Sequence, residues 1–238
     1  MERLDKYLSS RSGLSRRDAQ KKIKCGEVTL DGEVCRQIDR KVDGESVVAL
    51  NGQTVSSEKY MYIMMNKPAG VVSATEDKRE KTVLDILPPE LRRRGLFPAG
   101  RLDKDTEGLL IITNDGELAH RMLSPKKHVE KTYIATLDKP AGEQTIEAFE
   151  RGIVLSDGTE FMPAKLKINT NDNNVATVTI CEGKFHQVKR MFAACGLNVV
   201  HLKRISIGNL YLDSNLPIGS CKSLTNLEIQ AVFIGNIH

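Results

Sequence analysis

The sequence predicts an α+β fold, in which a small N-terminal α/β domain precedes a larger domain built on a mainly antiparallel mixed sheet with flanking helices. Stretches with the two-residue alternation of β-strands follow one another, and helical patterns stand apart from them. A run of small polar residues at 51–60 interrupts both patterns. We therefore expect two domains, 1–58 and 59–238.

The composition is that of an ordinary globular protein. Of 238 residues, 40% are hydrophobic and 28% charged, which argues against disorder. No apolar run approaches the roughly 18 residues of a membrane span, and charges near the N-terminus interrupt any signal-peptide core. We therefore expect a cytoplasmic protein that does not bind membranes. The five scattered cysteines predict reduced thiols, without a disulfide framework or a zinc site.

The first domain is expected to hold two helices, a hairpin and a further strand. In chain order these cover residues 3–10, 16–25, 27–37 and 45–50. Ser15 is a good N-cap for the second helix, and Gly26 follows its end. The Asp31-Gly32 pair is the strongest short signal for a tight hairpin turn.

The second predicted helix is strongly basic. Arg17, Lys21 and Lys24 recur at i, i+4 and i+7, so they share one face, and Arg16 begins the same segment. For this helix alone, a solvated charged face is as good an explanation as a binding surface. The net charge of +4 is too small to indicate nucleic acid by itself. The clustering of the positive charge is what favours phosphate binding.

Alternating and amphipathic segments follow one another through the second domain. Strands are expected within 60–66, 71–75, 109–113, 130–137, 152–161, 164–170 and 174–180, and helices within 116–124, 142–152 and 186–196. In the last helix, Val188, Met191, Phe192 and Cys195 recur at helical spacing and form a buried stripe that ends at Gly196.

The segment GRLDKDTEGLL, residues 100–110, places Asp103, Asp105 and Glu107 directly before an apolar run. The spacing copies half of a calcium-binding loop, but the twelfth position is Asn114 and no helices flank it, so calcium is disfavoured. A strand edge whose acids face water is the usual explanation for such residues. Arg101 stands two positions before Asp103, at the entry to a segment that must be buried, which makes Asp103 the candidate for chemistry.

The same segment resembles the catalytic motif of the RsuA family of pseudouridine synthases. Further resemblances follow in family order, in NKPAGVVS, SPKKHVEKTY, EGKFHQVKRMFAACG and IGNLYLD. The order of elements in the first domain resembles the small RNA-binding domain named after the fourth protein of the small ribosomal subunit. Asn209 stands where the family usually has glycine, and asparagine tolerates the left-handed backbone of such a turn.

The resemblance implies that Asp103 is the catalytic aspartate and that no cofactor or metal takes part. A tyrosine in a strand is most often core, but the K-x-Y motif implies that Tyr133 lies against the target base. Lys189 occupies the basic position that pairs with the aspartate, where many relatives have arginine. The remaining substrate-binding candidates are Arg101, Lys131, His186, Gln187 and Arg190, with Arg16, Arg17, Lys21 and Lys24 in the first domain.

Some of these assignments have simpler alternatives. His186, Lys189 and Arg190 share a helix face that could merely be solvated. No second ligand at metal-binding spacing accompanies His186, so we treat it as structural or RNA-facing.

The expected partner is ribosomal RNA, most closely 16S ribosomal RNA or a partly assembled small subunit, bound by a monomer. A synthase acting on 23S ribosomal RNA and a non-catalytic RNA-binding assembly factor are the alternatives.

Overall fold

The structure is a computed structural model that describes residues 1–93 and 95–234. It divides into two compact units, Met1–Met61 with Pro88–Leu96, and Tyr62–Leu87 with Phe97–His238. Among the described helices, none has the length and apolar character needed to cross a membrane.

The N-terminal unit contains two helices and two small sheets. Its elements are β1 (Glu2–Arg3), α1 (Leu4–Arg11), α2 (Arg16–Lys24), β2 (Val28–Leu30), β3 (Glu33–Val34), β4 (Lys41–Val42), β5 (Val48–Leu50), β6 (Gln53–Thr54) and η1 (Pro89–Leu91). Strand β1 pairs with β4, and the other four strands lie in the order β3-β2-β5-β6. The predicted hairpin turn is confirmed, because Asp31 and Gly32 both have the positive φ that it requires.

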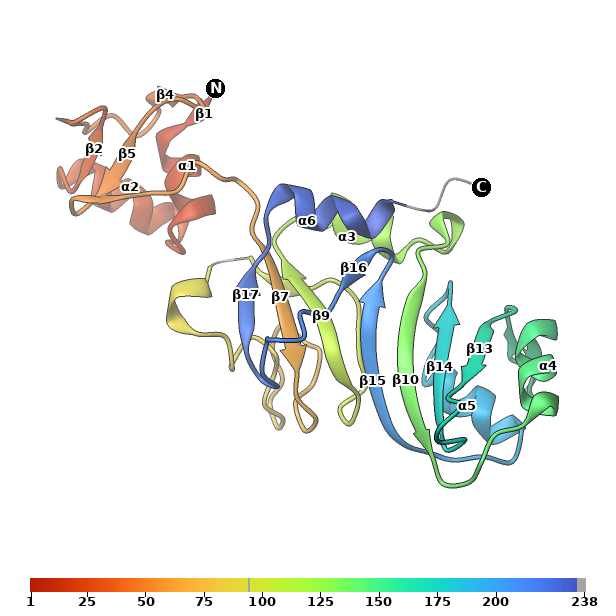
Figure 1. Ribbon diagram of the computed structural model, residues 1–238. Coiled ribbons are helices and arrows are strands. Elements are labelled where there is room, and N and C mark those ends of the chain that lie inside the picture. Colours follow the sequence, from red (N-terminus) through yellow and green to blue (C-terminus); the bar gives the residue numbers. More distant parts are fainter. Residues whose placement is uncertain (94, 235–238) are drawn as a thin grey trace. The chain divides into compact units, whose positions relative to one another are not determined.

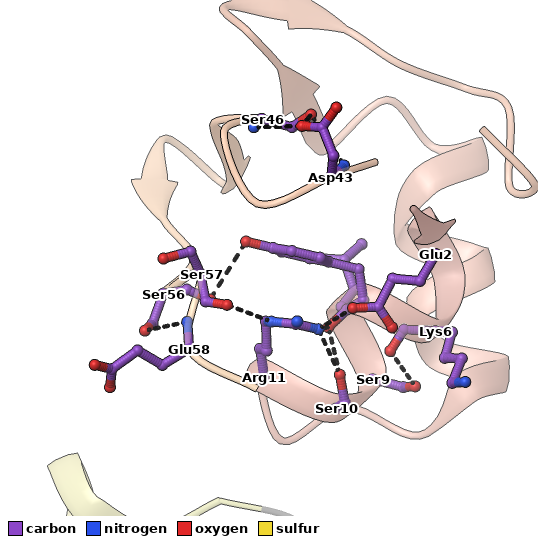
Figure 2. Close-up of polar contacts among 12 residues, drawn as sticks. Glu2, Lys6, Ser9, Ser10, Arg11, Asp43, Ser46, Ser56, Ser57 and Glu58 are labelled. Atoms are coloured by element: carbon purple, nitrogen blue, oxygen red, sulfur yellow. Dashed lines mark hydrogen bonds and ion pairs between the residues drawn. The ribbon is translucent and has the colours of Figure 1, made fainter. Parts of the chain in front are cut away.

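Part of the segment predicted as a linker packs within this unit. Arg11 of α1 donates from Nε to the carbonyl oxygen of Ser57 at 3.1 Å, and its Nη1 lies 2.7 Å from a carboxylate oxygen of Glu2 (Figure 2). The same guanidinium lies over the ring of Tyr7, 3.9 Å from its centroid. These contacts fasten the chain after β6 to helix α1.

The C-terminal unit is built on one mixed sheet (Figure 1). Along it, the strands are β13 (Lys165–Ile168), β14 (Val175–Ile180), β10 (Lys131–Leu137), β15 (Val199–Ile207), β9 (Glu107–Thr113), β7 (Tyr62–Lys67) and β17 (Cys221–Ser223), with β8 (Phe97–Pro98) paired to β9 and β16 (Leu210–Tyr211) to β15. Among the described pairings of this sheet, only that of β15 with β9 is parallel. The predicted fold class, α+β with a mainly antiparallel mixed sheet, is confirmed.

The remaining elements of this unit flank the sheet. They are α3 (Gly116–Leu123), η2 (Pro125–Lys127), α4 (Glu143–Arg151), α5 (Gln187–Ala194), α6 (Asn226–Gln230), η3 (Ala231–Phe233) and a hairpin of β11 (Ile153–Val154) and β12 (Glu160–Phe161). Helix α4 lies at the β13 end of the sheet (Figure 1). Phe149 of α4 packs on Phe192 of α5, with ring centroids 4.8 Å apart.

Two features of the sheet differ from the sequence prediction. Residues 71–75 do not form a strand, since Val72 makes only an isolated bridge with Thr82. The hydroxyl of Ser73 instead accepts from the amide of Leu102 and donates to its carbonyl. The second difference is β15, a nine-residue strand that the alternation analysis did not identify and that lies between β10 and β9.

Strand β15 sets the spacing of the site. Its Arg204 is opposite Tyr133 on one neighbour, β10, and opposite Gly108 on the other, β9. The β10–β15 register shifts between Thr132 and Tyr133, an irregularity of the kind that redirects a side chain. Only strand β15 therefore separates Tyr133 on β10 from the end of the loop that precedes β9.

Gly108 allows β9 to approach β15. Its φ is +99°, and a Cβ atom there would lie 2.2 Å from the carbonyl oxygen of Arg204.

We expect Gly108→Ala to lower the free energy of unfolding by about 2–4 kcal/mol, because both strand backbones would have to move. Urea denaturation measures this. Gly116→Ala is the control, since nothing lies within 4 Å of its Cβ position, and an equal loss in both variants would contradict the explanation.

Candidate active site

The loop before β9 is a turn and not an extension of the strand. The amide of Thr106 donates to the carbonyl oxygen of Asp103 at 3.1 Å. The three acids therefore do not lie along one extended strand, and their nearest partners differ. The carboxylate of Asp105 accepts from Nζ of Lys189 at 2.5 Å, and that of Glu107 lies 3.0 Å from Nε2 of His201.

Lys67 holds this turn from inside. Its side chain is completely buried at the end of β7. Nζ lies 3.1 Å from the carbonyl oxygen of Asp103 and 2.9 Å from that of Thr106, and it also approaches those of Pro68 and Lys104. Burial lowers the pKa of Lys67 to about 8, so the group is mostly charged at neutral pH. Nothing in the sequence pattern shows that this lysine is buried.

The carboxylate of Asp103 lies between two basic side chains of the α5 region. Its side chain is 28% exposed. One oxygen lies 3.6 Å from Nε2 of His186, and the other lies 3.8 Å from Nζ of Lys189. Lys189 is thus near Asp103, but its shorter contact is to Asp105. That hydrogen bond is the main cause of the lowered pKa of Asp105.

Asp103 and Tyr133 line one cavity. Its other walls are Arg101, Leu102, Thr106, Ile180, Gly183, Lys184, His186, Gln187, Val188 and Leu202. A larger cavity of about 640 Å³ shares Arg101 and Tyr133 and adds Lys131 and Arg204. The sheet order accounts for this meeting, because β10 and the loop before β9 are separated only by β15.

Arg204 is a site residue that the sequence analysis missed. It is 3% exposed, and its Nε donates to the carbonyl oxygen of Leu109 at 2.7 Å. Nη1 donates to the hydroxyl of Tyr133 at 3.4 Å, and Nη2 has no hydrogen-bond partner among the described atoms. Recognising the β-branched run at 199–207 as a strand would have placed Arg204 on an inward-facing position.

Lys131 is the second buried cation beside Tyr133. Its Nζ donates to the carbonyl oxygen of Val129 at 2.9 Å. Burial, followed by the charge of Arg204, lowers its pKa to about 8. Lys131 and Arg204 are thus two buried cations that line the larger cavity, and neither is hydrogen-bonded to a carboxylate in the described part of the chain.

Two other candidates contact different parts of the fold. Gln187 is buried and donates from Nε2 to the carboxylate of Glu182, so it braces the loop before α5 while also lining the smaller cavity. Arg190 pairs with Asp157 of the β11–β12 hairpin and lies over Phe161. The structure does not bring Arg190 to Asp103.

The basic candidates of the first domain lie on α2. Arg17, Lys21 and Lys24 are exposed. Arg16 is held by the buried carboxylate of Asp5, with 3.2 Å between Nε and Oδ2.

Among the residues that the structure describes, no group of three or more His, Cys, Asp or Glu side chains could hold a metal ion. The arrangement is a part-exposed carboxylate beside a tyrosine, with cations on several sides. It can act on a sugar or base whose transition state gains positive charge near the carboxylate.

Comparison with known proteins identifies both units. The family model described as RNA pseudouridylate synthase matches residues 61–194, and the S4 domain model matches residues 2–48. An uncharacterized RNA pseudouridine synthase, YtzG of Bacillus subtilis (strain 168), is 47% identical over 231 residues, covering 96% of this chain and 97% of that protein.

A second curated relative and a solved structure are also described as pseudouridine or pseudouridylate synthases. Ribosomal small subunit pseudouridine synthase A of Escherichia coli (strain K12) is 41% identical and covers 97% of this chain and 99% of its own length. A solved structure described as a pseudouridylate synthase superposes with a TM-score of 0.68 at 38% identity, covering 98% of this chain and all of that one.

Removal of the Lys67 ammonium group should loosen the turn that carries Asp103. We expect Lys67→Met to speed hydrogen exchange at the amides of residues 103–106 and to lower turnover of RNA by about 100-fold, since a misplaced catalytic group costs that much. Lys104→Met, in the same turn but paired at the surface with Glu80, is the control. Unchanged exchange in the Lys67 variant would show that the carbonyl contacts do not order the turn.

Proposed function

We propose, from the premise that this chain belongs to the RNA pseudouridylate synthase family, that it converts a uridine of 16S ribosomal RNA to pseudouridine with Asp103 as the catalytic carboxylate. The observation that carries the proposal is the cavity shared by Asp103 and Tyr133, with His186 and Lys189 beside the carboxylate. No cofactor or metal is part of the proposal.

The reaction is an isomerisation. The bond from N1 of uracil to C1′ of ribose breaks, the base turns over, and a bond from C5 to C1′ forms, while C5 loses its hydrogen and N1 gains one. No electrons are exchanged with an oxidant or reductant. A carboxylate can attack C1′ or remove a sugar proton to form a glycal, and both routes require its ionised form.

Tyr133 supports the base in this scheme. It is largely buried and faces both cavities, so one face of its ring can lie against the extruded uracil. Arg204 donates to its hydroxyl and limits the positions of the ring. Lys131 and Arg101 supply positive charge for the phosphates that accompany the nucleotide.

The choice of 16S ribosomal RNA rests on the small-subunit synthase to which the chain is 41% identical. A synthase acting on 23S ribosomal RNA would share the same chemistry. A non-catalytic assembly factor is disfavoured, because such a protein would have no need to keep Asp103, Tyr133 and Lys189 together. We further propose a cytoplasmic monomer that acts on free RNA or on a partly assembled small subunit, with its domain boundary near residue 58.

The N-terminal unit is proposed to dock RNA. It carries the S4 match, and Arg17, Lys21 and Lys24 are exposed on α2. Contacts between such cations and phosphates contribute affinity but little sequence information. Choice of the uridine would then depend on the catalytic unit and on the RNA structure.

Asp103→Asn is the test of the catalytic assignment. The amide keeps the shape of the carboxylate but lacks its charge, so turnover should fall by at least about 1,000-fold while RNA binding persists. Tritium release from 5-tritiated uridine in a 16S transcript measures this. Asp105→Asn, which removes the closer partner of Lys189, is the matched control and should stay within about tenfold of the wild type. An active Asp103→Asn enzyme, or a wild type inhibited by EDTA, would overturn the assignment.

The docking role of α2 predicts a change in salt dependence. Replacement of Arg17, Lys21 and Lys24 together by alanine should weaken RNA binding and flatten the slope of log affinity against log salt by about 2–3 units, because fewer counterions are released. Filter binding from 50 to 200 mM salt measures the slope. The matched control is Lys41→Ala, on strand β4 outside the helix. A triple variant with the wild-type slope would remove α2 from the binding surface.

A further inference from the structure

Phe185 is a large apolar side chain left in solvent beside the site. Its side chain lies in the loop before α5, and the residue is 69% exposed. A single exposed hydrophobic residue is common on protein surfaces and means little alone. The surroundings of Phe185 are what set it apart.

The ring of Phe185 stacks on that of His186, with centroids 3.8 Å apart and an angle of 18° between the planes. His186 has φ 48° and ψ 33°, a left-handed conformation that costs energy in a residue other than glycine. Nε2 of the same imidazole lies 3.6 Å from the carboxylate of Asp103. The inner ring of the pair thus touches the catalytic group, and the outer ring presents a flat face to solvent.

This outer ring lines a third cavity, different from the two that Tyr133 lines. The cavity measures about 460 Å³, and its walls include Arg101, Asp103, Lys104, Phe185 and His186. Tyr133 is not among its lining residues, and Phe185 does not line the smaller cavity that Asp103 shares with Tyr133. Asp103 therefore borders two hollows, one with a tyrosine face and one with a phenylalanine face.

The second hollow has the chemistry of a nucleotide site. An aromatic face suits a base of any identity, and the cation of Arg101 suits an adjoining phosphate. Lys104 in the same wall is already paired with Glu80 at 2.8 Å, and Asp77 also lines the hollow. A uridine drawn out of the RNA leaves its neighbours partly unstacked, so an aromatic surface at that point recovers stacking that the RNA has lost.

We propose that Phe185 stacks on a base that neighbours the target uridine, while the uridine itself enters the Tyr133 cavity. This inference rests on the proposed function, because it takes the uridine to be bound at Asp103. His186 is a positioning residue here, since it supports the ring of Phe185 from behind.

The chain contains no tryptophan, so Phe185→Trp introduces a unique indole at this point. Titration with a 16S transcript should quench its fluorescence as a base stacks on it. Inorganic polyphosphate, which carries charge but no bases, should not. The control is Tyr211→Trp, a residue of β16 that is 64% exposed and lines neither hollow, and the transcript should leave its fluorescence unchanged.

Kinetics with smaller and conservative replacements complete the test. Phe185→Leu should raise KM for the transcript about tenfold or more, whereas Phe185→Tyr, which keeps an aromatic ring, should have a KM near that of the wild type. The thermal unfolding midpoint should stay constant, because the ring is exposed. The inference would be overturned if polyphosphate quenched the indole as strongly as the transcript does. It would also be overturned if the transcript caused no quenching although filter binding shows a complex, or if Phe185→Leu had the wild-type KM. If the wild type forms no pseudouridine in the transcript, the proposed function fails, whereas the fluorescence result still decides the role of Phe185 in binding RNA.

Discussion

The ammonium group of Lys67 is surrounded by backbone carbonyl oxygens from both sides of the turn that carries Asp103. A buried charge without an opposite charge in contact is costly, and here several carbonyl dipoles offset that cost. The turn is therefore fixed through its backbone, which leaves the carboxylate of Asp103 free for other partners. Ser73 adds a second fixed point, because its hydroxyl exchanges hydrogen bonds with the backbone of Leu102.

The ion pairs around the turn are of unequal length. Nζ of Lys189 lies closer to the carboxylate of Asp105 than to that of Asp103. Asp105, at a variable position of the motif, is therefore its main ion-pair partner. Behind Tyr133, Arg204 and Lys131 lie in the interior without a carboxylate in hydrogen-bond contact among the described residues. The interior of the site is thus positive on its Tyr133 side, which suits a polyanionic substrate.

The sequence was sufficient for the fold class, because β7, β10 and β14 show clear β patterns and Asp31-Gly32 marks a hairpin turn. It was insufficient for β15, since Arg204 and Ser206 occupy inward positions and disguise the alternation. The family motif singled out Asp103 and Tyr133, which line one cavity. It could not reveal that Lys67 is buried or that Arg190 turns to Asp157, because both depend on contacts between distant segments.

The parallel pairing of β9 with β15 also constrains the order of folding. In the strand register, Glu107 of β9 lies opposite Lys203 of β15, a residue synthesised much later. Strand β15 also separates the Asp103 turn from Tyr133. Contacts so distant in sequence form slowly, because a long loop must close first. The N-terminal unit has its own buried core, and its last segment ends at Leu96. On the ribosome, this unit can fold while the catalytic sheet still lacks its middle strand, so the nascent chain completes its RNA-binding unit before its active site.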